Sequence, residues 1–220
     1  GHPGTEPPAP PAPAASADAD TVPIESLLYE GPRALQRALE LQPEFPMAKL
    51  ARALVRLYTG DFDGGWDDYE ARRASDDFPS RQPLVPEWDG SSLEGRSVLV
   101  YCEQGIGDEI MFASCLPALI RDARTCVVES EPRLASLFAR SFTGATVVPA
   151  SADRTLPHDI LRRGLEIEIP IGSLPRALRL GRPEPAAYFT PDPARVHRWQ
   201  HRLADAGSGL QVGISWQGGV

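Results

Sequence analysis

A turn that combines carboxylates with glycines is the part of this sequence best suited to chemistry. It runs through Glu103-Gln104-Gly105-Ile106-Gly107 and is followed at once by Asp108, where a helical pattern begins. A carboxylate held at the mouth of a cleft can act as a general base and take a proton from an attacking hydroxyl group. Asp108 is therefore the candidate catalytic residue. The competing interpretation is that Asp108 only caps the helix.

The same turn does not match either of two common phosphate-binding motifs. Gly105 and Gly107 give Gly-x-Gly, but Ile110 stands in the place of the third glycine of a dinucleotide fingerprint. Asp108 and Glu109 at the helix start would repel a pyrophosphate. A Walker loop is also absent, because no Gly-Lys-Ser/Thr follows. We therefore expect no bound cofactor and no metal ion.

The chain around this turn predicts an α/β unit. Residues 97–102 form a short continuous apolar run, typical of a buried parallel strand. Strands that alternate with helices predict a parallel sheet with helices on both faces. Such sheets bind ligands beyond the carboxyl ends of their strands, where the turn lies. The expected strands are 97–102, 126–128, 145–148, 166–169 and 210–216, and the expected helices are 108–121, 132–140, 173–180 and 193–206.

Residues 24–78 predict a helical region that resembles tetratricopeptide (TPR) repeats. A shift of 34 residues, the TPR period, places Leu35 on Tyr69. Arg72 departs from the small residue usual at its position. Fewer than two repeats are present, so the region must dock on the rest of the chain or continue an array upstream. The apolar stripes at helical spacing lie in residues 31–42 and 46–73.

Three further segments have linker-like or incomplete patterns. Residues 1–23 are rich in proline and alanine and predict a disordered linker. Residues 79–95 predict a second linker, pinned to a surface by Pro83, Trp88 and Leu93. Residues 210–220 read as a strand and a glycine turn that start a second, truncated domain, so we expect the natural protein to continue.

Composition excludes several classes of protein. The formal net charge is -8, which argues against nucleic-acid binding, since that needs a basic face. No apolar run approaches the roughly 20 residues of a membrane helix, and no signal peptide is visible. Cys102, Cys115 and Cys126 lie in apolar surroundings and indicate buried free thiols, so we expect a cytoplasmic protein. His197 and His201 share a helix face, but flanking arginines favour a solvated surface over a zinc site.

The segment CEQGIGDEIMFASCLPAL resembles the first strand, turn and helix of bacterial TPR proteins with a glycosyltransferase-like domain. These proteins are related to the heptosyltransferase family (glycosyltransferase family nine). Gly107-Asp108 and Pro117 stand where that family has a Gly-Asp turn and a helix proline. Other blocks follow in the family's order, so the resemblance covers about residues 31–220: GDFDGGWDDYEAR, WDGSSLEGRSVLV, IPIGSLPRAL, YFTPDPARVHRWQHRL and VGISWQGG.

The resemblance implies the GT-B architecture, in which two Rossmann-like domains face each other across a cleft. Residues 96–209 would form the N-terminal, acceptor-side domain. The intact protein would transfer a sugar from a nucleotide sugar to a hydroxyl group of a glycan or protein, with inversion and with Asp108 as base. The fragment alone would be inactive. Substrate-binding roles are implied for Glu103, Gln104, Gly105, Gly107 and Glu109 near the acceptor, and for Trp216, Gln217, Gly218 and Gly219 near the donor phosphates.

A second function class stays open beside the transferase. In it the protein is a non-catalytic interaction module, in which residues 24–78 bind a protein partner as TPR repeats do and the α/β unit is only a scaffold. An oxidoreductase that uses a small nucleotide is disfavoured by the failed glycine fingerprint.

Overall fold

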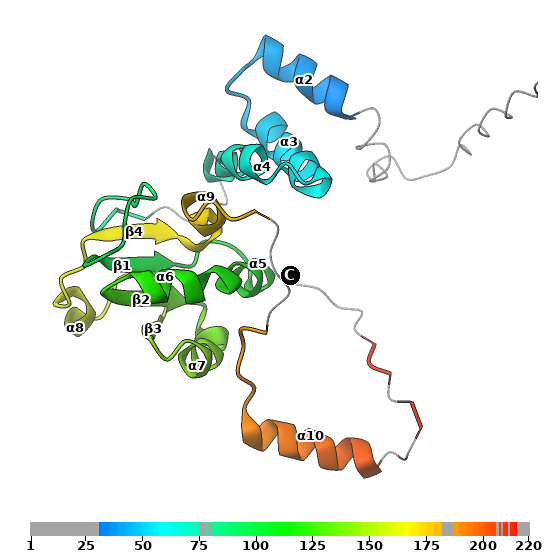
Figure 1. Cartoon of the computed structure of the whole chain (residues 1–220), viewed down its shortest axis with the longest axis vertical. Coiled ribbons are helices and arrows are strands. Elements are labelled where there is room, and N and C mark those ends of the chain that lie inside the picture. The colour runs from blue at the N-terminus through cyan, green and yellow to red at the C-terminus, as the bar shows by residue number, and fades with distance from the viewer. Residues whose placement is uncertain are drawn as a thin grey trace, which may run out of the picture.

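The computed structural model describes residues 31–74, 78, 81–181, 187–205, 207, 209–210 and 212–214 of the chain. It is a mixed α/β fold built on a four-stranded parallel sheet in the order β3-β2-β1-β4 (Figure 1), consistent with the expected Rossmann-like class. Residues 210 and 212–214 of the expected last strand are not in a strand, and its other residues lie outside the described ones. The strands are β1 (Ser97–Tyr101), β2 (Thr125–Ser130), β3 (Ala145–Pro149) and β4 (Ile167–Pro170).

The direction in which strands are added to the sheet reverses at β1. The chain adds β2 and then β3 on one side of β1, and returns to place β4 on the other side. The carboxyl ends of β1 and β4 lie side by side, with Tyr101 opposite Pro170. Doubly wound sheets bind ligands in the crevice outside the strands at such a reversal. The turn at residues 103–107 starts at this point.

One face of the sheet holds the main hydrophobic core. Val98, Val100 and Val128 pack there with Phe112 and Phe138. The expected helix 108–121 is instead two helices joined by a 3-10 turn, because Pro117 lacks an N–H and its ring crowds the carbonyl of residue 113. The helices on this face are α5 (Ile106–Phe112), η2 (Ala113–Cys115), α6 (Leu116–Asp122) and α7 (Pro132–Ser141).

The other face is covered differently from the expectation of helices on both sides. Leu99 and Val127 point to this face and pack with Leu156 and Ile160. In the part of the chain that the structure describes, the one helix of this smaller cluster is the four-residue α8 (His158–Leu161). The connection between β3 and β4 is polar over much of its length and contains Pro157 and Gly164, which favour turns over a longer helix.

The segment before β1 packs along the open edge of the sheet. Trp88 and Leu93 are buried as expected, whereas Pro83 is exposed and does not pin the segment. Glu87 forms a parallel bridge with Glu168 of β4, and the Trp88 N–H donates to the Glu168 carbonyl at 2.8 Å. The segment thus satisfies backbone groups that an edge strand would otherwise leave unpaired.

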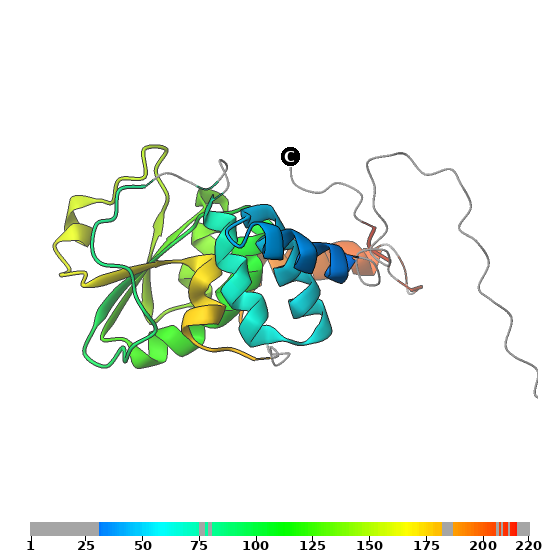
Figure 2. The same ribbon diagram turned by 90° about the horizontal axis from the view of Figure 1, so that it is seen from above.

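The N-terminal helices dock on the α/β unit. This is one of the two arrangements expected from the sequence, the other being a longer repeat array upstream. Trp66 and Tyr69 pack against Phe112 of α5, with ring centroids 6.1 and 5.9 Å from the Phe112 ring. Figure 2 shows these helices gathered beside the sheet. Within this region, Asp68 accepts hydrogen bonds from Arg52 and Arg56 and ties α3 to α4. The elements are α2 (Gly31–Leu41), α3 (Pro46–Thr59), α4 (Phe62–Tyr69) and η1 (Glu70–Ala74).

The last described helices differ in how they are packed. After β4 come η3 (Ile171–Ser173) and α9 (Leu174–Ala177), shorter than the helix expected at 173–180. The helix α10 (Pro193–Asp205) agrees with its expected range, but none of its residues is buried and Figure 1 shows it apart from the sheet. His197 and His201 lie on this exposed helix, as expected. Among the described residues, no helix is long and apolar enough to cross a membrane.

Candidate functional site

Asp108 stands at the carboxyl end of the central strand β1, in the first turn of α5. Gly105 is the N-cap residue of α5, and no side chain caps this helix. The Asp108 carboxylate folds back over Gly105, since a Cβ on that glycine would lie 3.6 Å from Asp108 Oδ2. Asp108 is half-buried, while Gly105 and Gly107 are exposed. The carboxylate is therefore held beside bare backbone that an incoming group can approach.

Tyr69 of the helical region lies at the same place. Its hydroxyl oxygen is 3.0 Å from Gln104 Nε2 and 3.2 Å from Gln104 Oε1. Burial raises the pKa of Tyr69, and the charge of Asp108 acts in the same direction. Tyr69 thus joins the helical region to Gln104 of the turn, a contact that the sequence did not predict.

Glu103 is buried rather than open to the cleft. It accepts a hydrogen bond from Arg72 Nη2 at 2.8 Å, and the two side chains are 0% and 5% exposed. It also accepts from the Gly172 N–H at 2.9 Å. A Cβ at Gly172 would come within 2.5 Å of Glu103 Oε1, so this close approach requires glycine. Glu103 joins the ends of β1 and β4 to the helical region.

Two neighbouring side chains complete this buried network. The Ser173 hydroxyl accepts from Arg72 Nη2 at 2.8 Å and lies 2.8 Å from Glu70 Oε1, to which it donates. Arg72 Nη1 donates to the same Glu70 oxygen at 2.9 Å. Arg72 of the helical region therefore fills the crevice at the point where the strand order reverses. A ligand at this edge of the sheet would bind beside the network and not within it.

Glu109 is buried inside the protein, whereas its neighbour Asp108 is only half-buried. It is 1% exposed, and both of its oxygens accept from the Glu131 backbone N–H, at 2.9 and 3.1 Å. Burial raises the pKa of Glu109 to about 7, with the negative charges of Glu131 and Glu129 adding to the effect and Arg154 opposing it. The structure thus separates Glu109 from the position around Asp108.

We expect Glu109→Gln to flatten the pH dependence of stability. The folded-state pKa lies above the ordinary value of 4.5, so the stability that protonation adds is complete below pH 4.5 and is lost as the pH rises through 7. This shift corresponds to roughly 3 kcal/mol. Urea unfolding of both proteins from pH 4 to pH 8 measures the difference. The control is Glu94→Gln at an exposed carboxylate, and equal slopes for wild type and Glu109→Gln would contradict the prediction.

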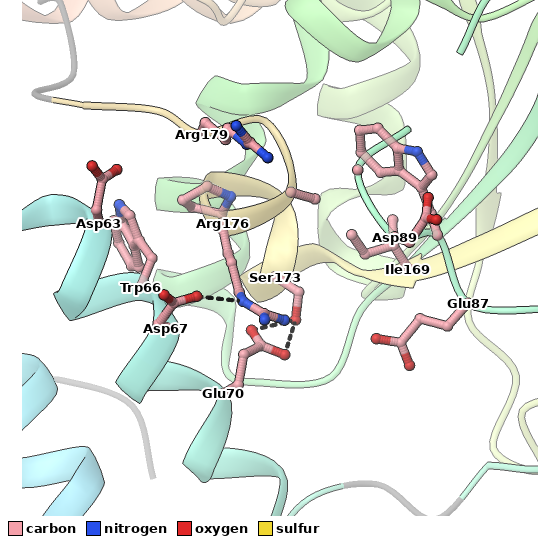
Figure 3. Close-up of a pocket in the computed structure, with 14 residues that line it drawn as sticks. Asp63, Trp66, Asp67, Glu70, Glu87, Asp89, Ile169, Ser173, Arg176 and Arg179 are labelled. Carbon is pink, nitrogen blue, oxygen red and sulfur yellow. Dashed lines mark hydrogen bonds and ion pairs between the residues drawn. The ribbon is translucent and has the colours of Figure 1, made fainter. Parts of the chain in front are cut away.

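A cavity of about 390 Å³ opens at the seam between the helical region and the α/β unit (Figure 3). Trp66 of α4 lines it, and its indole Nε1 is buried without a hydrogen-bond partner. Arg176 of α9 also lines it and donates to Asp67 at 2.8 Å. None of the described residues predicted for the site lines this cavity, which is formed by segments far apart in the sequence. The other lining residues are Asp63, Glu70, Glu87, Trp88, Asp89, Gly90, Ile169, Ser173, Pro175, Ala177 and Arg179.

The three cysteines are buried free thiols, as expected. Burial raises the pKa of Cys102 and Cys115 to about 11 and that of Cys126 to about 12, which disfavours the nucleophilic thiolate. Among the described residues, no group of three or more His, Cys, Asp or Glu side chains is arranged to hold a metal ion. The predicted donor-side residues Trp216, Gln217, Gly218 and Gly219 lie outside the described part of the chain.

The chain is similar to one curated protein over most of its length. Protein FlbA of Caulobacter vibrioides is 33% identical to it over 192 residues, which cover 79% of this chain. The chain spans only 32% of the length of FlbA. No protein-family model and no solved structure matches the chain.

Proposed function

We propose that this chain is the acceptor-binding part of a GT-B glycosyltransferase, with Asp108 as the base. The helices α2 to α4 would be TPR-like repeats fused to it, and the protein would act in the cytoplasm. The observation that carries the proposal is the position of the Asp108 carboxylate. It lies in the first helical turn after the central strand, half-buried, above a glycine and on a helix without a side-chain cap.

The proposed chemistry uses this carboxylate once in each turnover. Asp108 takes the proton of the acceptor hydroxyl while that oxygen forms its bond to the anomeric carbon of the donor sugar. The bond from this carbon to the nucleoside diphosphate breaks on the opposite side, so the configuration inverts. Tyr69 and Gln104, which are hydrogen-bonded to each other at the same turn, would donate hydrogen bonds to oxygens of the acceptor.

Other groups of the turn have supporting parts in this proposal. Gly105 and Gly107 keep the approach to Asp108 free of side chains, since a Cβ at Gly107 would meet no atom within 4 Å. Glu103, just after β1, links η3 and the helical region through its bonds to the Gly172 N–H and to Arg72. The nucleotide sugar would be bound mainly by a second domain that follows residue 209. In that domain Trp216, Gln217, Gly218 and Gly219 would approach the donor phosphates.

Titration calorimetry with nucleoside diphosphates and nucleotide sugars tests this proposal. The 220-residue chain is compared with the full protein encoded by the gene. We expect the full protein to bind one nucleotide and its sugar conjugate, and the shorter chain to bind neither. The same nucleosides without phosphate serve as the control for nonspecific heat. Absence of binding to both proteins would contradict the transferase.

A second candidate function has its own support in the exposed apolar side chains of the helical region. Leu54 and Tyr58 are four residues apart on α3 and are 59% and 72% exposed. Met47 at the start of the same helix is also exposed. Apolar side chains gathered in this way are typical of a surface that binds another protein. If nucleotides fail to bind, a non-catalytic TPR-type module is the better account.

A further inference from the structure

The carboxyl end of β2 contains buried polar atoms without partners, away from Asp108. Glu129 and Ser130 are the last two residues of β2 and are 1% and 0% exposed. Glu129 Oε1 and the Ser130 hydroxyl have no hydrogen-bond partner. Arg81, from the segment before β1, is paired with the other Glu129 oxygen, and its own Nε and Nη2 are buried without partners. Ser130 points to the opposite face of the sheet from Glu129, because neighbouring residues of a strand alternate between its faces. Buried polar atoms are nearly always hydrogen-bonded, so the three unpaired atoms of Arg81 and Glu129 require an explanation.

The two free donors of Arg81 form the side of the guanidinium that holds oxyanions. Nε and Nη2 point in parallel and fit two oxygens of one carboxylate or phosphate. Within this chain, Arg52 uses the same two atoms to bind the Asp68 carboxylate, at 2.6 and 2.7 Å. Arg81 is fixed in position for such a partner, since its Nη1 donates to Glu129 and its Cζ lies 4.8 Å from the centre of the Tyr101 ring.

The remaining atom at this place, Glu129 Oε1, calls for a different group on the same ligand. Glu129 Oε1 can only accept when the carboxylate is ionised, so it requires a donor such as a hydroxyl group. A ligand that fits this strand end therefore carries negatively charged oxygens for Arg81 and a hydroxyl group for Glu129.

We propose that the carboxyl end of β2 binds an oxyanion that carries a neighbouring hydroxyl group, held by the Nε and Nη2 atoms of Arg81 and by Glu129. Acidic sugars and phosphorylated sugars share this chemistry. The proposal does not depend on the proposed transfer reaction, because binding at this site can be measured without any enzymatic activity. The three atoms are closed off from solvent. Binding therefore requires a local opening, and its association rate is below that of an open pocket.

Thermal unfolding with three probes tests the site at matched ionic strength. The probes are glucuronate, which offers a carboxylate, glucose 6-phosphate, which offers a phosphate, and glucose, which offers only hydroxyl groups. We expect at least one of the two anions to raise the melting temperature by about 4 °C at ten times its dissociation constant. The anion that binds identifies the source of the oxyanion. Equal shifts with all three probes, or no shift, would overturn the proposal.

Arg81→Lys removes the paired donors but keeps the positive charge next to Glu129. We expect it to weaken anion binding at least tenfold, whereas Arg121→Lys at an exposed pair with Asp122 leaves binding unchanged. If Arg81→Lys does not fold, the double variant Arg81→Met/Glu129→Met replaces it. That variant removes both charges together, which buried ion pairs tolerate, and is expected to fold without binding. Binding by either folded variant with wild-type affinity would overturn the proposal.

Discussion

Replacing Glu103 with alanine should lower the free energy of unfolding by about 3 to 5 kcal/mol, because it leaves a buried guanidinium without its main partner. Glu103 and Arg72 are both shielded from solvent and are 2.8 Å apart. The substitution also removes the acceptor of the Gly172 N–H. Arg72 keeps Glu70 and Ser173, which favours the lower end of the range. Urea unfolding at pH 7 measures the loss.

Two further variants test whether the loss of stability in Glu103→Ala comes from breaking a buried ion pair or only from removing a negative charge. Glu40→Ala removes the exposed pair with Arg37 and should cost no more than about 0.5 kcal/mol. The double variant Arg72→Met/Glu103→Leu should recover most of the stability, since it removes both buried charges and fills their volume. A Glu103→Ala protein as stable as the Glu40→Ala protein would contradict the assignment of Glu103 to the seam.

The strands of the sheet were predictable because their signal is local. Residues 97–102 are almost all apolar, and a strand buried on both faces needs just such a run. The cover of the second face was not predictable in this way. Arg81 and Glu129 are 48 residues apart, and only the folded sheet brings them together. The sequence therefore predicts helices on both faces of the sheet. On the second face, the described residues have only the short helix α8, and Arg81 pairs with Glu129 of β2.

At the candidate site around Asp108, too, contacts within one turn could be predicted from the sequence, whereas contacts between distant segments could not. Asp108 and its glycines lie within one turn, so their proximity follows directly from the sequence. The burial of Glu109 depends on the Glu131 N–H, which comes from the end of a different strand. Arg72 did give a signal, since it breaks the small-residue pattern of the repeat at its position. The structure explains this departure, because Arg72 is the buried partner of Glu103.

Asp108→Asn should lower the rate of sugar transfer by about a hundredfold to ten-thousandfold, provided that Asp108 is the base. The amide has nearly the same shape but cannot take the proton of the acceptor hydroxyl. The donor site lies elsewhere in the proposed architecture, so binding of the nucleotide sugar should not change. The measurements are turnover of the full protein and calorimetric binding of the nucleotide sugar. Asp122→Asn, on the exposed end of α6, is the matched control and should leave both unchanged.

This substitution also distinguishes catalysis from helix capping, the competing role for Asp108. Asparagine caps a helix about as well as aspartate, so Asp108→Asn would preserve a cap while it removes a base. Asp108 occupies the third position of α5, and the N-cap position belongs to Gly105. A base therefore predicts lost turnover with the thermal stability of wild type for both Asp108→Asn and Asp108→Ala. A cap predicts normal turnover for Asp108→Asn and lower stability only for Asp108→Ala, and that outcome would remove Asp108 from the mechanism.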